Sequence, residues 1–162
     1  MKASVRRIAI SGHRGLPGPT TDLVDNAIRA ALAEHAPDMT GLSCLADGAD
    51  QIFARAVTDL GGKLEVTIPA SEYRAGLPAA AHAGYDRLLA LATATHRMPF
   101  TESTSQAHME ASKAMIDQAD ELYAVWDGQS ARAYGGTADV VAYARGHGTP
   151  VRVIWPQGAE RD

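Results

Sequence analysis

The sequence has one cysteine, no basic run longer than Arg6-Arg7 and no long apolar stretch near its start. Because a single thiol cannot close an intramolecular disulfide, Cys44 excludes a disulfide-stapled fold. The 15 basic and 19 acidic residues give a formal charge of −4, which argues against the basic face of a nucleic-acid-binding domain. The apolar segment 8–10 is too short for a signal peptide or a membrane span. We therefore expect a cytoplasmic protein with no membrane association, and we do not expect nucleic acid as its partner.

The size and composition are those of one ordinary globular domain. The chain has 162 residues, of which 46% are hydrophobic and 21% are charged. A chain of this length buries a hydrophobic core without disulfides or metals. The sequence contains no internal repeat and no domain boundary, so we predict a single domain over 1–162 with its core in 5–155.

Strand-like and helix-like segments alternate along the chain with short connections. Such alternation predicts a parallel sheet with helices on both faces. Segment 71–81 is less regular and is a candidate flap over a site, and the tail from Pro156 is expected to be frayed. The predicted strands cover 5–11, 40–44, 64–68, 95–98, 121–126 and 151–155; the predicted helices cover 49–60, 85–92, 105–119 and 134–145, after a first helix that Thr21 or Asp22 caps and that ends near His35.

Three turns, at 12–18, 45–49 and 127–137, each follow a strand and open a helix. Small residues dominate all three, and the first and third are rich in glycine. Glycine lets a ligand approach the backbone, and a helix N-terminus presents N–H groups that suit phosphate. For any one loop, an unusual backbone angle explains the glycine better. Three such loops at the carboxyl edge of one sheet, where ligands of open parallel sheets bind, favour a site.

Several standard motifs are absent. The first loop begins Gly12-His13-Arg14-Gly15, so it lacks the G-x-G-x-x-G fingerprint, and no G-x-x-x-x-G-K-[ST] sequence occurs. These absences argue against an ordinary dehydrogenase and a P-loop NTPase. The six histidines form no H-x-x-x-H pattern, and neither C-x-x-C nor G-x-S-x-G is present. We therefore expect no metal, no cofactor and no serine triad.

The charged residues of the first two loops have two interpretations each. Arg14 either forks onto a phosphate or forms a surface ion pair. His13 either acts as a general base or, more commonly for a loop histidine, hydrogen-bonds its own turn. Asp47 and Asp50 flank the second turn, and capping of the next helix by Asp47 is favoured over catalysis.

Residues after the later strands are also candidates. Asp127 either accepts hydrogen bonds from ribose hydroxyls or begins a turn with Gly128. Glu102 follows the fourth predicted strand and is placed to face the site. Tyr134 either stacks on a base or packs over the last helix. Cys44, at a strand end, is expected to be a small buried apolar residue.

Four segments together resemble one known group. In order and spacing, over Val5 to Trp155, they resemble the SLOG superfamily, which joins the DNA-processing protein A (Smf) family with the Lonely Guy cytokinin-activating enzymes. The resemblance implies an α/β, Rossmann-like, doubly wound fold: a mainly parallel sheet of about six strands, flanked by helices in three α/β/α layers. It also implies a pocket for a nucleotide or a nucleotide-derived molecule. The four segments are Ser11-Gly12-His13-Arg14, residues 42–50, Val125-Trp126-Asp127-Gly128 and residues 135–141.

The loops and the resemblance together define the predicted ligand-binding residues. They come from the ends of the first, second and fifth predicted strands. They are Gly12, His13, Arg14, Gly15, Leu45, Ala46, Asp47, Gly48, Asp127, Gly128, Gly135, Gly136 and Thr137.

One departure from the family pattern concerns catalysis. Lonely Guy enzymes carry G-G-x-G-T-x-x-E, and their glutamate is needed for hydrolysis, whereas the third residue after Thr137 is Val140. Asp139 lies one residue before the position of that glutamate. Because a helix turns by roughly 100° per residue, Asp139 points to a different side of the helix. The candidates for a catalytic carboxylate are therefore Asp127, Asp139 and Glu102, and none is assigned.

Three functions are compatible with these features. The first is a binding or sensing module for a nucleotide-derived ligand, which needs only the loops and Arg14. The second is a nucleotide N-glycosidase or phosphoribohydrolase of the Lonely Guy kind. The third is a DNA-processing factor that binds single strands, against which the acidic balance counts. We also expect a homo-oligomer, with a dimer preferred; Met109, Met115 and Ile116 form either that contact or part of the core.

Overall fold

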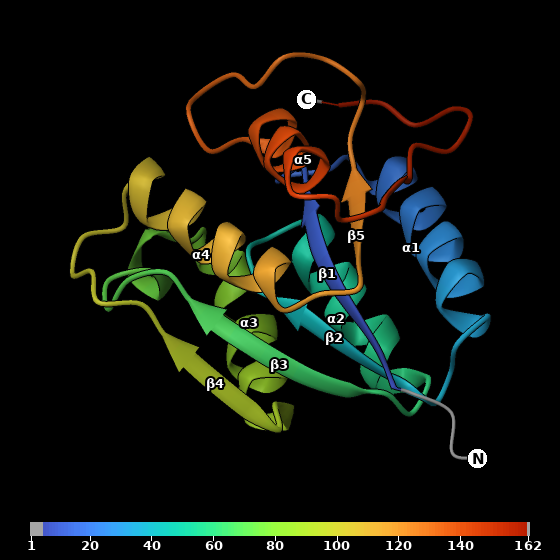
Figure 1. The fold of residues 1–162 in the computed structure, drawn as a ribbon, viewed down its shortest axis with the longest axis horizontal. Coiled ribbons are helices and arrows are strands. Elements are labelled where there is room, and N and C mark those ends of the chain that lie inside the picture. The colour runs from blue at the N-terminus through green and yellow to red at the C-terminus, as the bar shows by residue number, and fades with distance from the viewer. Residues whose placement is uncertain (1–4, 162) are drawn as a thin grey trace.

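The computed structural model describes residues 5–161, and these form one α/β unit (Figure 1). The predicted alternation of strands and helices is confirmed, with ends that shift by a few residues. The strands are β1 (Arg6–Gly12), β2 (Met39–Ser43), β3 (Lys63–Ile68), β4 (Ala94–Arg97), β5 (Glu121–Val125) and β6 (Val151–Val153); the helices are α1 (Gly18–Ala33), α2 (Ala49–Asp59), α3 (Ala79–Leu91), α4 (Ser105–Asp117) and α5 (Thr137–Gly146), with a 3₁₀ turn at Arg74–Gly76.

The strands form one six-stranded sheet in the order β4-β3-β2-β1-β5-β6. Every pairing between neighbours is parallel. The chain moves outward from β1 to β4, and it then returns to the other side of β1 with β5. The strand order therefore reverses between β1 and β5, which is where open α/β sheets bind their ligands.

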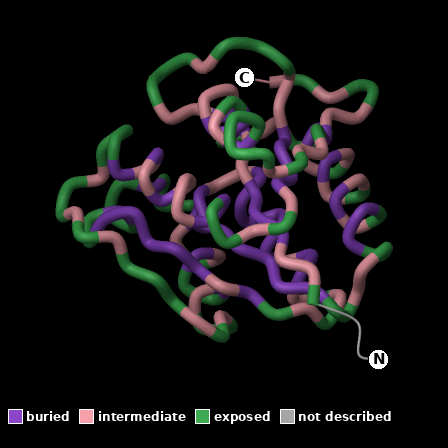
Figure 2. Tube along the Cα trace, in the orientation of Figure 1, coloured by how far each residue is buried: buried purple, intermediate pink, exposed green. Residues whose placement is uncertain are grey.

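Helices cover both faces of the sheet, as the predicted three-layer Rossmann-like fold requires. In β1, Ile8 and Ile10 pack in the apolar layer under α1 and α2, and Ala9 packs in the layer under α4 and α5. Helix α3 lies beside α2 on the first face (Figure 1). Figure 2 shows that the buried parts of the chain are the central strands and the inner sides of the helices.

Three side chains that were candidates for an oligomer contact belong to the core instead. Met109, Met115 and Ile116 are each at most 4% exposed, and they pack against the sheet face that carries Ala9. The core alternative is therefore confirmed for these residues. None of the helices within 5–161 is both long and apolar enough to cross a membrane.

The first helix begins earlier than predicted. It starts at Gly18 after Pro17, and no side chain caps it, so the expected caps at Thr21 and Asp22 are wrong. The Thr21 N–H already donates to the Pro17 carbonyl at 2.8 Å. Pro19 lies in the first turn, where its missing N–H has no helical partner to lose and its fixed φ suits the helix.

Two irregular segments are more ordered than expected. In 71–81, the side chains of Tyr73 and Leu77 are buried, and α3 begins at Ala79 rather than at 85. The tail beyond Pro156 is not frayed, because it is bonded to the first turns of α1. The Glu160 N–H donates to Thr20 Oγ1 at 2.8 Å, and the Thr20 hydroxyl donates to the Glu160 carbonyl at 3.0 Å.

Candidate functional site

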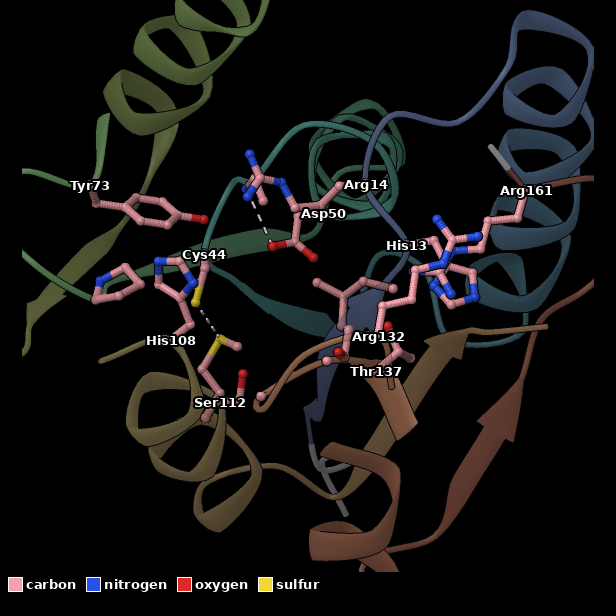
Figure 3. Close-up of a pocket in the computed structure, with 18 residues that line it drawn as sticks. His13, Arg14, Cys44, Asp50, Tyr73, His108, Ser112, Arg132, Thr137 and Arg161 are labelled. Carbon is pink, nitrogen blue, oxygen red and sulfur yellow. Dashed lines mark hydrogen bonds between the residues drawn. The ribbon is translucent and has the colours of Figure 1, made fainter. Parts of the chain in front are cut away.

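A cavity of about 340 Å³ opens at the carboxyl edge of the sheet, next to the switch point between β1 and β5 (Figure 3). Its walls come from the ends of β1, β2 and β3 and from the loop between β5 and α5. Two further segments, α4 and the C-terminal tail, also line it, and the sequence did not indicate them. The lining residues are Ile10, Ser11, Gly12, His13, Arg14, Cys44, Ala46, Asp50, Pro69, Tyr73, His108, Ser112, Met115, Arg132, Gly135, Gly136, Thr137 and Arg161.

Arginines predominate among the charged side chains that line the cavity, although the chain as a whole is negative. Arg14, Arg132 and Arg161 line the cavity, and Asp50 is the one carboxylate among the lining residues within 5–161. The first residue of α5, Thr137, and the glycine before it also reach the cavity. A helix N-terminus carries partial positive charge and unpaired N–H groups. The arrangement therefore suits an anionic group.

Gly12 lets three elements converge beneath the cavity. A Cβ atom at this position would lie 2.4 Å from the Ala49 Cβ and 2.7 Å from the Val125 Cβ. Gly12 ends β1, Ala49 begins α2 and Val125 ends β5. Only glycine therefore allows β1 to pass between the other two without displacement.

His13 holds its turn against the end of β5. Its imidazole is 4% exposed, its Nε2 accepts the Asp127 backbone N–H at 3.0 Å, and its ring lies edge-on to Trp155. Burial lowers the pKa of His13, and the Arg161 cation acts in the same direction, while the Asp127 carboxylate only partly opposes them. The neutral ring accepts a backbone N–H from the loop after β5 and not from its own turn, so His13 links two loops instead of bracing the turn that it belongs to.

Arg14 forms an ion pair, which was one of its two predicted roles, and it also lines the cavity. Its Nε lies 2.9 Å from Asp47 Oδ1, and the other Asp47 oxygen accepts the Gly15 N–H at 3.1 Å. The expected capping of α2 by Asp47 is wrong, because Gly48 occupies the N-cap position without a side-chain bond. Asp47 instead ties the second loop to the first.

Asp50 is the acidic group inside the cavity. It lies in the first turn of α2 and is 9% exposed, and its Oδ2 accepts the Ala46 N–H at 3.2 Å. Burial raises the pKa of Asp50 to about 7, although the Ala46 hydrogen bond and the Arg14 cation oppose the rise. The sequence placed Asp50 beside the second turn but gave it no role.

The three candidate catalytic carboxylates do not line the cavity. Asp139 Oδ2 accepts the Gly135 N–H at 2.9 Å and so braces the loop before α5. Asp127 Oδ1 accepts the Gln129 N–H at 3.0 Å, as in the turn interpretation. Glu102 is exposed, and Val140, at the position of the Lonely Guy glutamate, is buried.

The predicted ligand-binding residues divide into two groups. Residues that line the cavity are Gly12, His13, Arg14, Ala46, Gly135, Gly136 and Thr137. Outside it lie Gly15, Leu45, Asp47, Gly48, Asp127 and Gly128. Leu45 has a positive φ of 60° and is fully buried in the core, which explains why it does not face the cavity. Tyr134 is 57% exposed and also lies outside the lining.

The wall opposite the glycine loop comes in part from segment 71–81, the candidate flap, through Tyr73, and in part from α4, which was not expected to reach the site. Tyr73 is buried and meets the His108 ring edge-on at 5.5 Å, and His108 Nε2 lies 2.7 Å from the Ser103 hydroxyl. Cys44 is buried as expected, with its sulfur 3.9 Å from that of Met115. These residues carry no sequence motif, so only the tertiary fold brings them together.

Arg161 reaches the cavity from the C-terminal tail. The Thr20–Glu160 bonds hold the tail against α1, and an Arg161 nitrogen lies 3.8 Å from Asp127 Oδ2. The resemblance ended at Trp155 and therefore gave no signal for this residue. Among residues 5–161, no group of three or more His, Cys, Asp or Glu side chains is placed to hold a metal ion.

The fold and the cavity define a Rossmann-like α/β protein with a cationic site at its switch point. No family model and no curated protein matches the chain. Solved structures do match in fold. DNA processing protein A from Helicobacter pylori, described for its binding of single-stranded DNA, superposes with a TM-score of 0.70 at 15% identity, over 97% of this chain and 69% of that one.

Two further structures extend the comparison. DNA processing protein A from Streptococcus pneumoniae gives a TM-score of 0.68 at 16% identity, over 94% of this chain and 51% of that one, so the present chain spans about half of its length. A molybdenum cofactor binding protein from Rippkaea orientalis gives 0.63 at 11% identity, over 96% and 80%.

The fold that the SLOG resemblance implied is therefore confirmed, and two of the matched structures belong to the DNA-processing group that the sequence indicated. At these identities the likeness shows the fold alone. Because one matched protein binds single-stranded DNA, the comparison gives no support to the expectation that nucleic acid is excluded as a partner.

Proposed function

We propose that the protein is a SLOG-type binding module that holds a nucleotide or nucleotide-derived molecule by its phosphate. The observation that carries this proposal is the cavity at the β1/β5 switch point, which three arginines and the N-terminus of α5 line. Arginine and helix N–H groups both bind phosphate oxygens well. The volume of about 340 Å³ is in the range of small-molecule sites.

The geometry favours binding over hydrolysis of the Lonely Guy kind. That reaction needs a carboxylate beside the sugar, yet Asp127, Asp139 and Glu102 all lie outside the cavity lining. The Asp139 carboxylate accepts the Gly135 N–H, and the residue at the position of the Lonely Guy glutamate is Val140. We therefore place the phosphoribohydrolase second and the DNA-processing factor third.

The first test compares the four common nucleoside 5′-monophosphates with the corresponding nucleosides by isothermal titration calorimetry. At least one nucleotide should bind at least tenfold more tightly than its nucleoside. Arg132→Gln and Arg161→Gln should each lower the affinity for that nucleotide by about tenfold, since a hydrogen bond to a charged group contributes about 1.5 kcal/mol or more. Arg87→Gln, on the exposed side of α3, is the matched control and should change nothing.

The outcomes separate the three functions. Equal affinity for nucleotide and nucleoside contradicts the phosphate site. Release of free base during incubation with the bound nucleotide would favour the hydrolase. Tight binding of a single-stranded oligonucleotide that the mononucleotide does not displace would favour the DNA-processing factor.

A further inference from the structure

We propose that Asp50 binds the sugar hydroxyls of the ligand and makes the cavity selective for ribonucleotides over deoxyribonucleotides. This inference rests on the proposed function, because it takes the ligand to be a nucleotide. It assigns a role to the single carboxylate among the lining residues within 5–161.

The Asp50 carboxyl is buried, fixed and directed into the cavity. It is 9% exposed, and the Ala46 N–H holds Oδ2 at 3.2 Å. The Ser43 hydroxyl donates to the Asp50 backbone carbonyl at 3.1 Å, which anchors the first turn of α2. Figure 3 shows the carboxyl near the middle of the cavity, beside Arg14. Buried carboxyl groups are normally hydrogen-bonded to donors. On the side of Asp50 that faces the cavity, a bound ligand can supply these donors.

The two ends of the cavity differ in chemistry, and Asp50 lies between them (Figure 3). Arg132, Arg161 and Thr137 form one end, which suits the phosphate. Tyr73, His108 and Ser112 lie at the other end, where the two rings offer flat surfaces for a base (Figure 3). In a nucleotide the sugar connects the phosphate to the base, so a group midway along the cavity meets the sugar.

Charge also determines which part of the ligand can lie beside Asp50. A carboxylate repels phosphate, so the phosphate must bind at the arginine end. A ribose presents two adjacent hydroxyl donors, and a carboxylate has two oxygens that accept them. A 2′-deoxy sugar offers one donor fewer and leaves a buried acceptor without its partner, which is the kind of loss that gives strong discrimination.

The test compares each ribonucleoside 5′-monophosphate with its 2′-deoxy and 3′-deoxy counterparts by calorimetry at pH 8. The wild-type protein should prefer the ribonucleotide by about tenfold. Asp50→Asn should bind the ribonucleotide about tenfold more weakly, and its binding of each deoxynucleotide should be less strongly affected, because a deoxynucleotide has already lost one of the two hydrogen bonds, so that the preference disappears. Glu102→Gln, an exposed carboxylate outside the cavity, is the matched control and should keep the full preference. Inorganic phosphate affinity and circular dichroism check that Asp50→Asn retains its fold and its anion site.

The results distinguish failure of the inference from failure of the proposed function. If the wild type binds ribo- and deoxynucleotides equally, the role of Asp50 is overturned while the nucleotide site stands. If Asp50→Asn loses discrimination between bases but keeps the ribose preference, Asp50 reads the base and the inference is again wrong. If no nucleotide binds more tightly than its nucleoside, the proposed function itself fails.

Discussion

At the scale of single residues, Asp50 links the cavity to the stability of the protein. Its pKa of about 7 in the folded chain lies above the ordinary value of 3.8, because burial disfavours the charged form. The folded state therefore holds a proton that the unfolded state has released. This contribution to stability is fully present below about pH 4 and is lost as the pH rises through about 7.

We predict that Asp50→Asn removes this pH dependence. Between pH 5 and pH 8, the free energy of unfolding of the variant should rise by about 2 to 3 kcal/mol relative to that of the wild type. Urea unfolding at each pH measures the difference. Glu102→Gln should follow the wild-type curve. Parallel curves for Asp50→Asn and the wild type would show that the carboxyl titrates normally.

The role of Asp50 could not be predicted from the sequence, although its neighbourhood could. The second turn was correctly placed at a strand end, because its small residues follow an apolar segment. The direction of each carboxylate depends on backbone angles that the sequence does not specify. With Gly48 at φ 84°, Asp47 reaches back to Arg14, and Asp50 turns into the cavity. The helix-capping preference of aspartate therefore pointed to the wrong role for Asp47.

At the scale of secondary-structure elements, Gly12 allows the end of β1 to pack tightly against the start of α2 and the end of β5. The Cβ atoms of Ala49 and Val125 are attached directly to the backbone, so neither can rotate away from an added methyl group. Gly12→Ala should therefore lower the free energy of unfolding by about 2 to 3 kcal/mol, as overpacking does. It should also weaken nucleotide binding, because α2 and β5 must separate at the cavity.

Gly18→Ala provides the matched control for Gly12→Ala. Apart from its two chain neighbours, a Cβ at Gly18 meets no atom within 4 Å, and the residue begins α1 without a positive φ. Its free energy of unfolding should change by less than about 1 kcal/mol, because the entropic gain from replacing glycine is offset by the Cβ, which disfavours the helical conformation before Pro19. Urea unfolding of both variants measures the contrast. Equal stability of the two variants would contradict the close approach at Gly12.

The elements themselves were more predictable than the site they build. The parallel sheet could be predicted because short apolar segments alternate with amphipathic ones along the chain. Strands and helices each space their apolar residues with a characteristic period, so each segment can be assigned from its own residues. The cavity walls from α4 and the tail were missed, because His108 and Arg161 are brought to the site by packing and by the Thr20–Glu160 bonds. No local pattern records such contacts. The glycine loops were found because their composition is itself local.

At the scale of the whole molecule, charge is unevenly distributed. The chain carries a formal charge of −4, yet three of the four charged side chains that line the cavity, leaving histidine aside, are arginines. A small anion can enter the cavity and meet those arginines. A long polyanion must also lie across a surface that is negative overall, so further phosphates add little attraction.

This charge distribution predicts how single-stranded DNA behaves. The affinity of a 5′-phosphorylated 20-nucleotide strand should stay within about threefold of that of the best mononucleotide. A plot of log affinity against log salt concentration should be no steeper than about −2, because a single strand gives a slope of roughly −0.7 per neutralised phosphate and the cavity offers three arginines. Fluorescence anisotropy between 50 and 300 mM salt measures the slope, and Arg87→Gln serves as a control that leaves it unchanged. A steep slope with tight binding would mean that many phosphates are contacted outside the cavity, and the protein would then act on nucleic acid rather than on a free nucleotide.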